Sequence, residues 1–99
     1  MIAPQDCKTM ADVRAGVDAL DRQIVTLLGE RFRFMDAAAR IKPERGHVRD
    51  EPRKAQVIDN ARRSAADCGV PVELAERLYE MLVEGSIAYE FDAFDARTG

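Results

Sequence analysis

The sequence predicts an all-α fold, in which a chain of three helices forms an intertwined homodimer. Apolar residues recur at steps of three and four along most of the chain, which is the period of a helix face. The sequence shows neither strand-like alternation nor an internal repeat. Its 99 residues, 46% hydrophobic and 33% charged, have the size and composition of one globular domain covering residues 1–99.

The first predicted helix covers about residues 10–42. Thr9 followed by Asp12 resembles a capping box at its start, and Pro43 ends the run. Apolar residues repeat along one face, and Arg31 fills the one slot that the pattern skips. The members of this face are Val13, Val17, Leu20, Ile24, Leu27, Phe34, Ala38 and Ile41.

The length of this helix predicts the oligomeric state. At 1.5 Å per residue it extends on the order of 50 Å, whereas a compact domain of about 100 residues has a radius of gyration of about 13 Å. One chain cannot cover both ends of such a helix, so a second copy is expected to cover the far end. The alternative is a helix that breaks near Gly29.

Two further helices follow. The second is predicted over about residues 50–68, with Asp50 as its N-cap residue and Gly69 at its end. The third covers about residues 71–96 and is followed by a short tail that begins at Arg97. The residues of the third helix expected to be buried are Leu74, Leu78, Met81, Leu82 and Ala88.

Charge and composition exclude several classes of function. A net charge of −3 and few aromatic residues argue against a nucleic-acid binder, although residues 40–54 carry six Lys or Arg against three acids and are expected to meet an anion. No run is apolar enough for a membrane span or a secretory signal, so a cytoplasmic protein is expected. Cys7, Cys68 and His47 lack metal-ligand spacing, so no metal site is predicted.

Cationic residues stand where apolar ones are expected. An unpaired guanidinium at Arg31 would be costly to bury, so an anionic partner is predicted, either a ligand or one of the chain's own acids. Lys42 follows eleven residues later on the same helix face. Arg14 is too far along the helix to share a small ligand with Lys42, but an antiparallel partner's copy could reach it. Arg53 opens the second helix, where it is either a ligand contact or a solvated charge.

Several stretches of the sequence resemble the all-helical, type II-like chorismate mutases and their relatives, the isochorismate pyruvate lyases. They occur in the family's order and spacing and together cover nearly the whole chain. The stretches are "VRAGVDALDRQIVTLLGERF", "AARIK", "VRDEPRK" and "LVEGSIAYE". The resemblance implies an intertwined dimer of three-helix chains, which agrees with the length of the first helix.

The resemblance also implies roles for individual residues. Arg14 is expected to be donated across the dimer, while Arg31 and Arg53 hold the two carboxylates of chorismate by charge-assisted hydrogen bonds. Lys42 and Glu90 are expected to approach the ether oxygen of the breaking bond. The implied reaction is the rearrangement of chorismate to prephenate, which needs no nucleophile, metal or cofactor.

The remaining implied contacts include two departures from the common pattern. Asp50 is expected to contact the ring hydroxyl, and Ser86 to line the pocket beside a carboxylate. Lys54 stands where mutases often carry glutamate, an acid that the lyases also lack. The family often has glutamine at the position of Glu90. A carboxyl group donates a hydrogen bond only when protonated, so faster catalysis is expected at acid pH.

Two alternatives to a mutase stay open on the sequence. One is the elimination of pyruvate from isochorismate, with the same cations on the same scaffold. The other is a non-catalytic helical dimer that binds an aromatic acid or a protein partner, in which case Arg31 would be paired within the protein.

Overall fold

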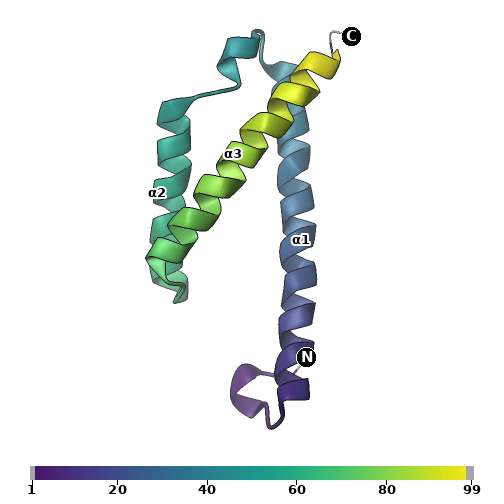
Figure 1. Ribbon diagram of the computed structural model, residues 1–99, viewed down its shortest axis with the longest axis vertical. Coiled ribbons are helices and arrows are strands. Elements are labelled where there is room, and N and C mark those ends of the chain that lie inside the picture. Colours follow the sequence, from purple (N-terminus) through teal and green to yellow (C-terminus); the bar gives the residue numbers. More distant parts are fainter. Residues whose placement is uncertain (1, 98–99) are drawn as a thin grey trace. The chain divides into compact units, whose positions relative to one another are not determined.

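The computed structural model describes residues 2–97 and consists of helices (Figure 1). Three α-helices are joined by short connections, and no strand occurs in this range, which confirms the predicted all-α class. No helix within it is both long enough and hydrophobic enough for a transmembrane segment. The elements in chain order are η1 (Pro4–Asp6), α1 (Met10–Ile41), η2 (Arg45–His47), α2 (Glu51–Cys68) and α3 (Val72–Arg97).

The start of α1 is a reciprocal capping box. The Oγ1 of Thr9 accepts a hydrogen bond from the backbone N–H of Asp12 at 3.1 Å, and the Asp12 carboxylate accepts from the N–H of Thr9 at 3.3 Å. Two of the N–H groups that a helix leaves unpaired at its start are thereby satisfied, which confirms the predicted cap.

Helix α1 is continuous through Gly29, so the alternative of a break at this glycine is wrong. The observed helix has 32 residues and ends one residue before the predicted limit. Its length is about 48 Å at 1.5 Å per residue. The helix tolerates Gly29 because a single glycine in a helix interior costs only about 1 kcal/mol relative to alanine.

The chain divides into two compact units, the first ending at Phe34 and the second beginning at Met35. The first unit is mostly α1, and its apolar residues are exposed in the single chain: Val17 is 50%, Ile24 54% and Leu27 62% exposed. We call the set Val13, Val17, Leu20, Ile24 and Leu27 the α1 apolar stripe. The prediction of one domain over residues 1–99 stays a prediction.

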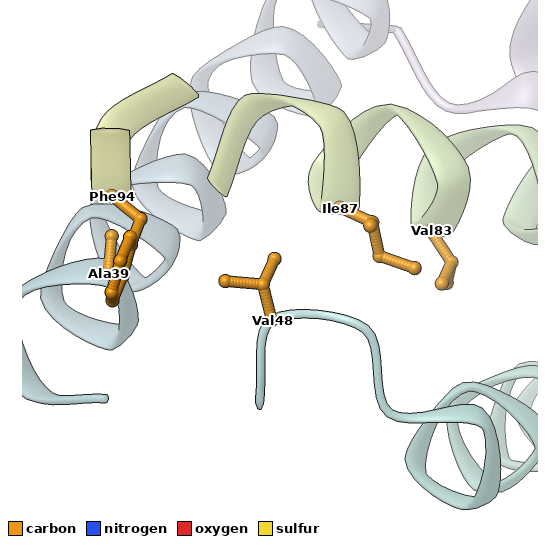
Figure 2. Packing of buried hydrophobic residues seen from close by; sticks show 5 residues of the cluster. All are labelled: Ala39, Val48, Val83, Ile87 and Phe94. Atoms are coloured by element: carbon orange, nitrogen blue, oxygen red, sulfur yellow. The ribbon is translucent and has the colours of Figure 1, made fainter. Parts of the chain in front are cut away.

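The second unit has a small core shown in Figure 2. Phe94 of α3 lies against Ala39 near the end of α1, and Val48 reaches in from the connection between α1 and α2. Helices α2 and α3 pack against each other within this unit. The buried apolar residues of the cluster are Ala39, Val48, Val83, Ile87 and Phe94.

The prediction of which residues of the third helix are buried was partly wrong. Leu74, Leu78 and Met81 are 47%, 56% and 77% exposed in the single chain, and Ala88 is also exposed. Helix α3 carries apolar residues on two faces, and the one turned into the second unit is the face of Ala75, Val83, Ile87 and Phe94. The helical period alone does not choose between two apolar faces.

Helix α2 has the predicted signals at both ends. The Asp50 carboxylate accepts a hydrogen bond from the N–H of Arg53 at 3.0 Å, as an N-cap residue does. At the other end Gly69 adopts a left-handed conformation with φ of 76°, which a residue with a Cβ rarely adopts. Both ends of α2 therefore follow from single residues.

Replacing Asp50 by alanine is expected to lower the free energy of unfolding by about 1 kcal/mol, because the N-cap hydrogen bond is lost. For a chain of this size that shifts the melting temperature by roughly 4–8 °C. Thermal unfolding followed by circular dichroism measures the shift. Asp50→Ser keeps a capping oxygen, so equal destabilisation by serine and alanine would show that capping is not the role of this side chain.

Two glycines are expected to respond to alanine in opposite ways. Gly85 lies inside α3, and a Cβ there meets nothing within 4 Å among the described residues, so Gly85→Ala is expected to stabilise the fold by up to about 1 kcal/mol. Gly69→Ala is expected to destabilise it by about 1 kcal/mol, because φ is positive. Chemical unfolding measures both. A loss of stability in Gly85→Ala would instead indicate a second chain packed close to that backbone.

Candidate active site

A buried ion pair joins the end of α1 to the middle of α3. The Nζ of Lys42 donates to both carboxylate oxygens of Glu90, at 2.9 and 3.0 Å. Glu90 is only 3% exposed, whereas the Lys42 side chain is 29% exposed. The carboxylate is therefore the enclosed partner, and the ammonium group is the one that a ligand could reach.

The backbone explains why these two side chains meet. Lys42 is the first residue after α1, and its N–H still donates to the carbonyl of Ala38 at 2.9 Å, so its side chain leaves the chain in helical register. Glu90 lies on the buried face of α3, one turn from Ile87 and from Phe94. A charged residue on an apolar helix face needs a partner, and Lys42 supplies it.

Ser86 is the second polar residue on the buried face of α3. It is 4% exposed and precedes Glu90 by one helical turn. Its hydroxyl donates to the carbonyl of Leu82 at 2.6 Å, which satisfies the donor within the helix. The structure thus brings Lys42, Ser86 and Glu90 to one part of the second unit.

Asp50 and Arg53 make hydrogen bonds at the start of α2 and not to the Lys42–Glu90 pair. The Asp50 carboxylate caps α2, and the guanidinium of Arg53 is exposed and donates to the side-chain oxygen of Gln56 at 2.6 Å. Asp50 could not offer the same lone pair to a ring hydroxyl while it caps the helix. The predicted contacts of these two residues with a substrate stay predictions.

Arg14 and Arg31 belong to the first unit, where both lie on α1. Arg14 is exposed, and Arg31 is partly buried. Both arginines are predicted to bind the substrate's carboxylates. These roles involve the second unit and another chain, and they stay predictions.

Lys54 is held in an ionic network between α2 and α3. Its Nζ donates to Glu80 at 2.7 Å and to Glu84 at 2.9 Å, and the guanidinium of Arg49 binds Glu84 from the other side at 2.8 Å. Hydrogen bonds from Arg49 and Lys54 hold the pKa of Glu84 at about 2, well below its ordinary value. The network contributes stability above the ordinary carboxyl pKa and loses it as the pH falls toward 2. The sequence analysis missed this role for Lys54 and Arg49.

An open groove of about 700 Å³ runs along α3, and its lining includes none of the residues predicted to bind substrate. Four of its six lining side chains are glutamates and only one is a cation, so it offers a dicarboxylate no cluster of positive groups. Within residues 2–97, no three acidic, cysteine or histidine side chains gather into a metal-binding group. The candidate site is therefore placed at the Lys42–Glu90 pair and not at this groove. The lining residues are Glu73, Glu76, Arg77, Glu80, Met81 and Glu84.

This pair has the chemistry of an electrophilic site. A lysine ammonium that is partly enclosed and oriented by a carboxylate can stabilise negative charge on a substrate oxygen more strongly than in water. A buried carboxyl beside it can either accept from a cation or, once protonated, donate. These properties suit a reaction in which charge develops on an oxygen atom.

Residues 13–91 match the family model described as chorismate mutase type II. The chain therefore belongs to this family of all-helical enzymes. It is also 31% identical over 88 residues to the isochorismate pyruvate lyase of Pseudomonas aeruginosa strain PAO1, an alignment that covers 89% of this chain and 87% of that protein. The two similarities support an enzyme of this family and differ in the reaction that they suggest.

Proposed function

We propose that the chain is a chorismate mutase, which rearranges chorismate to prephenate. The observation that carries the proposal is the enclosed Lys42–Glu90 pair, with Nζ at 2.9 and 3.0 Å from the carboxylate oxygens. In the proposed site Lys42 and Glu90 face the ether oxygen of the bond that breaks. The family match over residues 13–91 supports this reaction class.

The proposed mechanism relies on geometry and charge. Arg31, Arg53 and the partner chain's copy of Arg14 bind the two carboxylates and select the compact conformer in which the reacting carbons approach each other. Negative charge then develops on the ether oxygen as its bond to carbon breaks, and the ammonium group of Lys42 stabilises that charge. The substrate's own electrons make the new carbon–carbon bond, so the protein supplies no nucleophile.

A homodimer is part of this proposal. The α1 apolar stripe is exposed in the single chain, and Val17, Ile24 and Leu27 each expose half or more of their surface. A run of apolar residues along one helix is unfavourable in water unless another surface covers it. A second copy of α1 offers the same stripe, and a two-fold axis pairs identical surfaces. The pairing would also place an Arg14 from each chain near the other chain's site.

The second candidate function is the lyase reaction, the elimination of pyruvate from isochorismate. The similarity to the Pseudomonas aeruginosa lyase over 89% of this chain favours it. The residue at position 54 also favours the lyase. Lys54 has no carboxylate to bind a ring hydroxyl, and its ammonium group is already bound by Glu80 and Glu84. Lys42 would act on the same ether oxygen in both reactions, so the site residues alone do not separate them.

Incubating the purified protein with each substrate tests the proposal. Chorismate is expected to yield prephenate, detected by its acid-catalysed conversion to phenylpyruvate, at a rate abolished by heat denaturation. Salicylate and pyruvate from isochorismate, with no prephenate from chorismate, would establish the lyase instead. Inactivity on both substrates, together with loss of folding in Arg31→Ala, would indicate the non-catalytic dimer in which Arg31 is paired internally.

A further inference from the structure

The C-terminal end of α1 is capped by a side chain from the last residue of α3. Pro43 has no N–H, so the helical donor that would ordinarily reach the carbonyl of Ala39 is missing. Arg97 takes its place. Its Nη1 lies at hydrogen-bonding distance from the carbonyl oxygens of Ala39 at 2.9 Å, Arg40 at 3.1 Å and Lys42 at 2.7 Å.

The guanidinium of Arg97 is itself held in place. It stacks on the ring of Phe94 at 3.8 Å from the centroid, and Phe94 is 7% exposed within the core cluster of the second unit. Stacking on a fixed ring leaves the planar group few alternative orientations. Its positive charge also faces the negative end of the α1 dipole. The cap is therefore a preorganised contact and not a flexible surface arginine.

A second contact attaches the following segment to the same end of α3. Arg45 binds the Asp95 carboxylate through Nε at 2.8 Å and Nη2 at 3.3 Å, and its guanidinium lies 4.4 Å from the centre of the Phe91 ring. Val48, at the end of the segment, is 3% exposed in the core. Side chains from the last turns of α3 therefore hold this segment at Lys42 and Arg45, and Val48 fixes its far end in the core of the second unit.

We propose that Arg97 is a positioning residue for Lys42. Helix α3 binds Lys42 at both ends: the Glu90 carboxylate accepts from the ammonium group, and Arg97 donates to the backbone carbonyl at 2.7 Å. The four-carbon stem of lysine is flexible, so the position of its ammonium depends on how well the backbone at its root is fixed. The catalytic part of this proposal rests on the proposed function, whereas the structural part does not.

The catalytic consequence follows from the sensitivity of such sites to geometry. A misplacement of about 1 Å costs a catalytic group on the order of 100-fold in rate. Loss of Arg97 frees the Lys42 backbone but leaves Glu90 and the substrate-binding arginines unchanged. We therefore expect kcat to fall and KM to change little, which is the signature of a group misplaced in the transition state.

Hydrogen exchange and kinetics on the full-length chain test the proposal together. In Arg97→Ala, exchange in peptides covering residues 40–48 is expected to be about tenfold or more faster than in the wild type, with α2 unchanged. The kcat on chorismate is expected to fall by about tenfold or more. Arg97→Lys keeps the charge but loses the planar guanidinium with its several donors. Its exchange rate and kcat are expected to lie between those of the wild type and Arg97→Ala. Arg63→Ala, on the exposed face of α2, serves as the matched control.

A double-mutant cycle separates positioning from general stability. If Arg97 acts through Lys42, Arg97→Ala is expected to cause no further loss of kcat in a Lys42→Ala background. An equal loss in both backgrounds would overturn the positioning role. Unchanged exchange over residues 40–48 would overturn the cap itself. Should the wild type prove inactive on both substrates, the proposed function fails, and the exchange result alone still decides whether the cap exists.

Discussion

Replacing Lys42 by methionine is expected to lower kcat for the rearrangement of chorismate by about 10²–10³-fold, the usual loss when one preorganised electrostatic contact in the transition state is removed. Methionine has a similar length and is apolar, so the packing around the stem is kept while the charge is removed. The reason is specific to this position, because the Nζ of Lys42 is partly enclosed and oriented by Glu90. Steady-state kinetics with chorismate measures the loss.

The control for this prediction must account for stability. Without Lys42, the carboxylate of Glu90 stays buried without a counter-ion, which costs about 3 kcal/mol if it remains charged. Lys42→Met combined with Glu90→Gln removes both charges and is expected to regain stability but not activity. Lys8→Met changes an exposed lysine far along the chain and is expected to leave both unchanged. Full activity in Lys42→Met would exclude Lys42 from the mechanism.

Replacing Glu90 by glutamine is expected to change how the rate depends on pH. A protonated carboxyl donates to the ether oxygen, whereas the carboxylate cannot, so the wild-type rate is expected to rise as the pH falls. Glutamine donates at every pH. The rate of Glu90→Gln is therefore expected to stay constant across neutral pH. Above neutral pH it is expected to exceed the wild-type rate.

Rates at constant ionic strength, with the folded state checked at each pH, are the measurement for this prediction. Glu84→Gln is the matched control: Glu84 is also on α3, but it is bound by Arg49 and Lys54 and lies outside the proposed site. It is expected to keep the wild-type pH profile. If the Glu90→Gln and wild-type profiles have the same shape, Glu90 does not donate to the ether oxygen.

The sequence was sufficient for features that single residues decide. The box of Thr9 and Asp12, the cap at Asp50 and the left-handed turn at Gly69 each depend on local hydrogen bonds or backbone conformation, and each is present in the structure. The three-helix, all-α class follows from the apolar period and is also present. Local signals of this kind need no knowledge of what the helix packs against.

Tertiary partners were harder to predict. The packing face of α3 was assigned to Leu74, Leu78 and Met81 because they fit the helical period, but Ala75, Val83 and Ile87 fit it equally well. Arg97 was placed in a tail because nothing local marks it, and its contacts are 54–58 residues away in the chain. Pro43, which leaves a carbonyl without its donor, was the signal that a distant side chain was needed.

The candidate site divides in the same way. The resemblance to the family singled out Lys42 and Glu90 for one oxygen atom, and the structure places them 2.9 Å apart. The roles of Arg14 and Arg31 depend on a second chain and on a ligand, so neither local signals nor the contacts of a single chain decide them. Asp50 was given a substrate role, yet its carboxylate already caps α2.

If each site combines residues from two chains, mixing two impaired variants is expected to restore activity that neither has alone. Arg14→Ala and Lys42→Ala, each expected to keep only a small residual activity alone, are refolded together from equal amounts. Random pairing makes half of the dimers mixed, and one site in each mixed dimer has both residues, so about a quarter of wild-type activity is expected to return. A mixture no more active than its components, with mixed dimers demonstrated by mass spectrometry, would show that Arg14 and Lys42 do not combine in one site across the dimer.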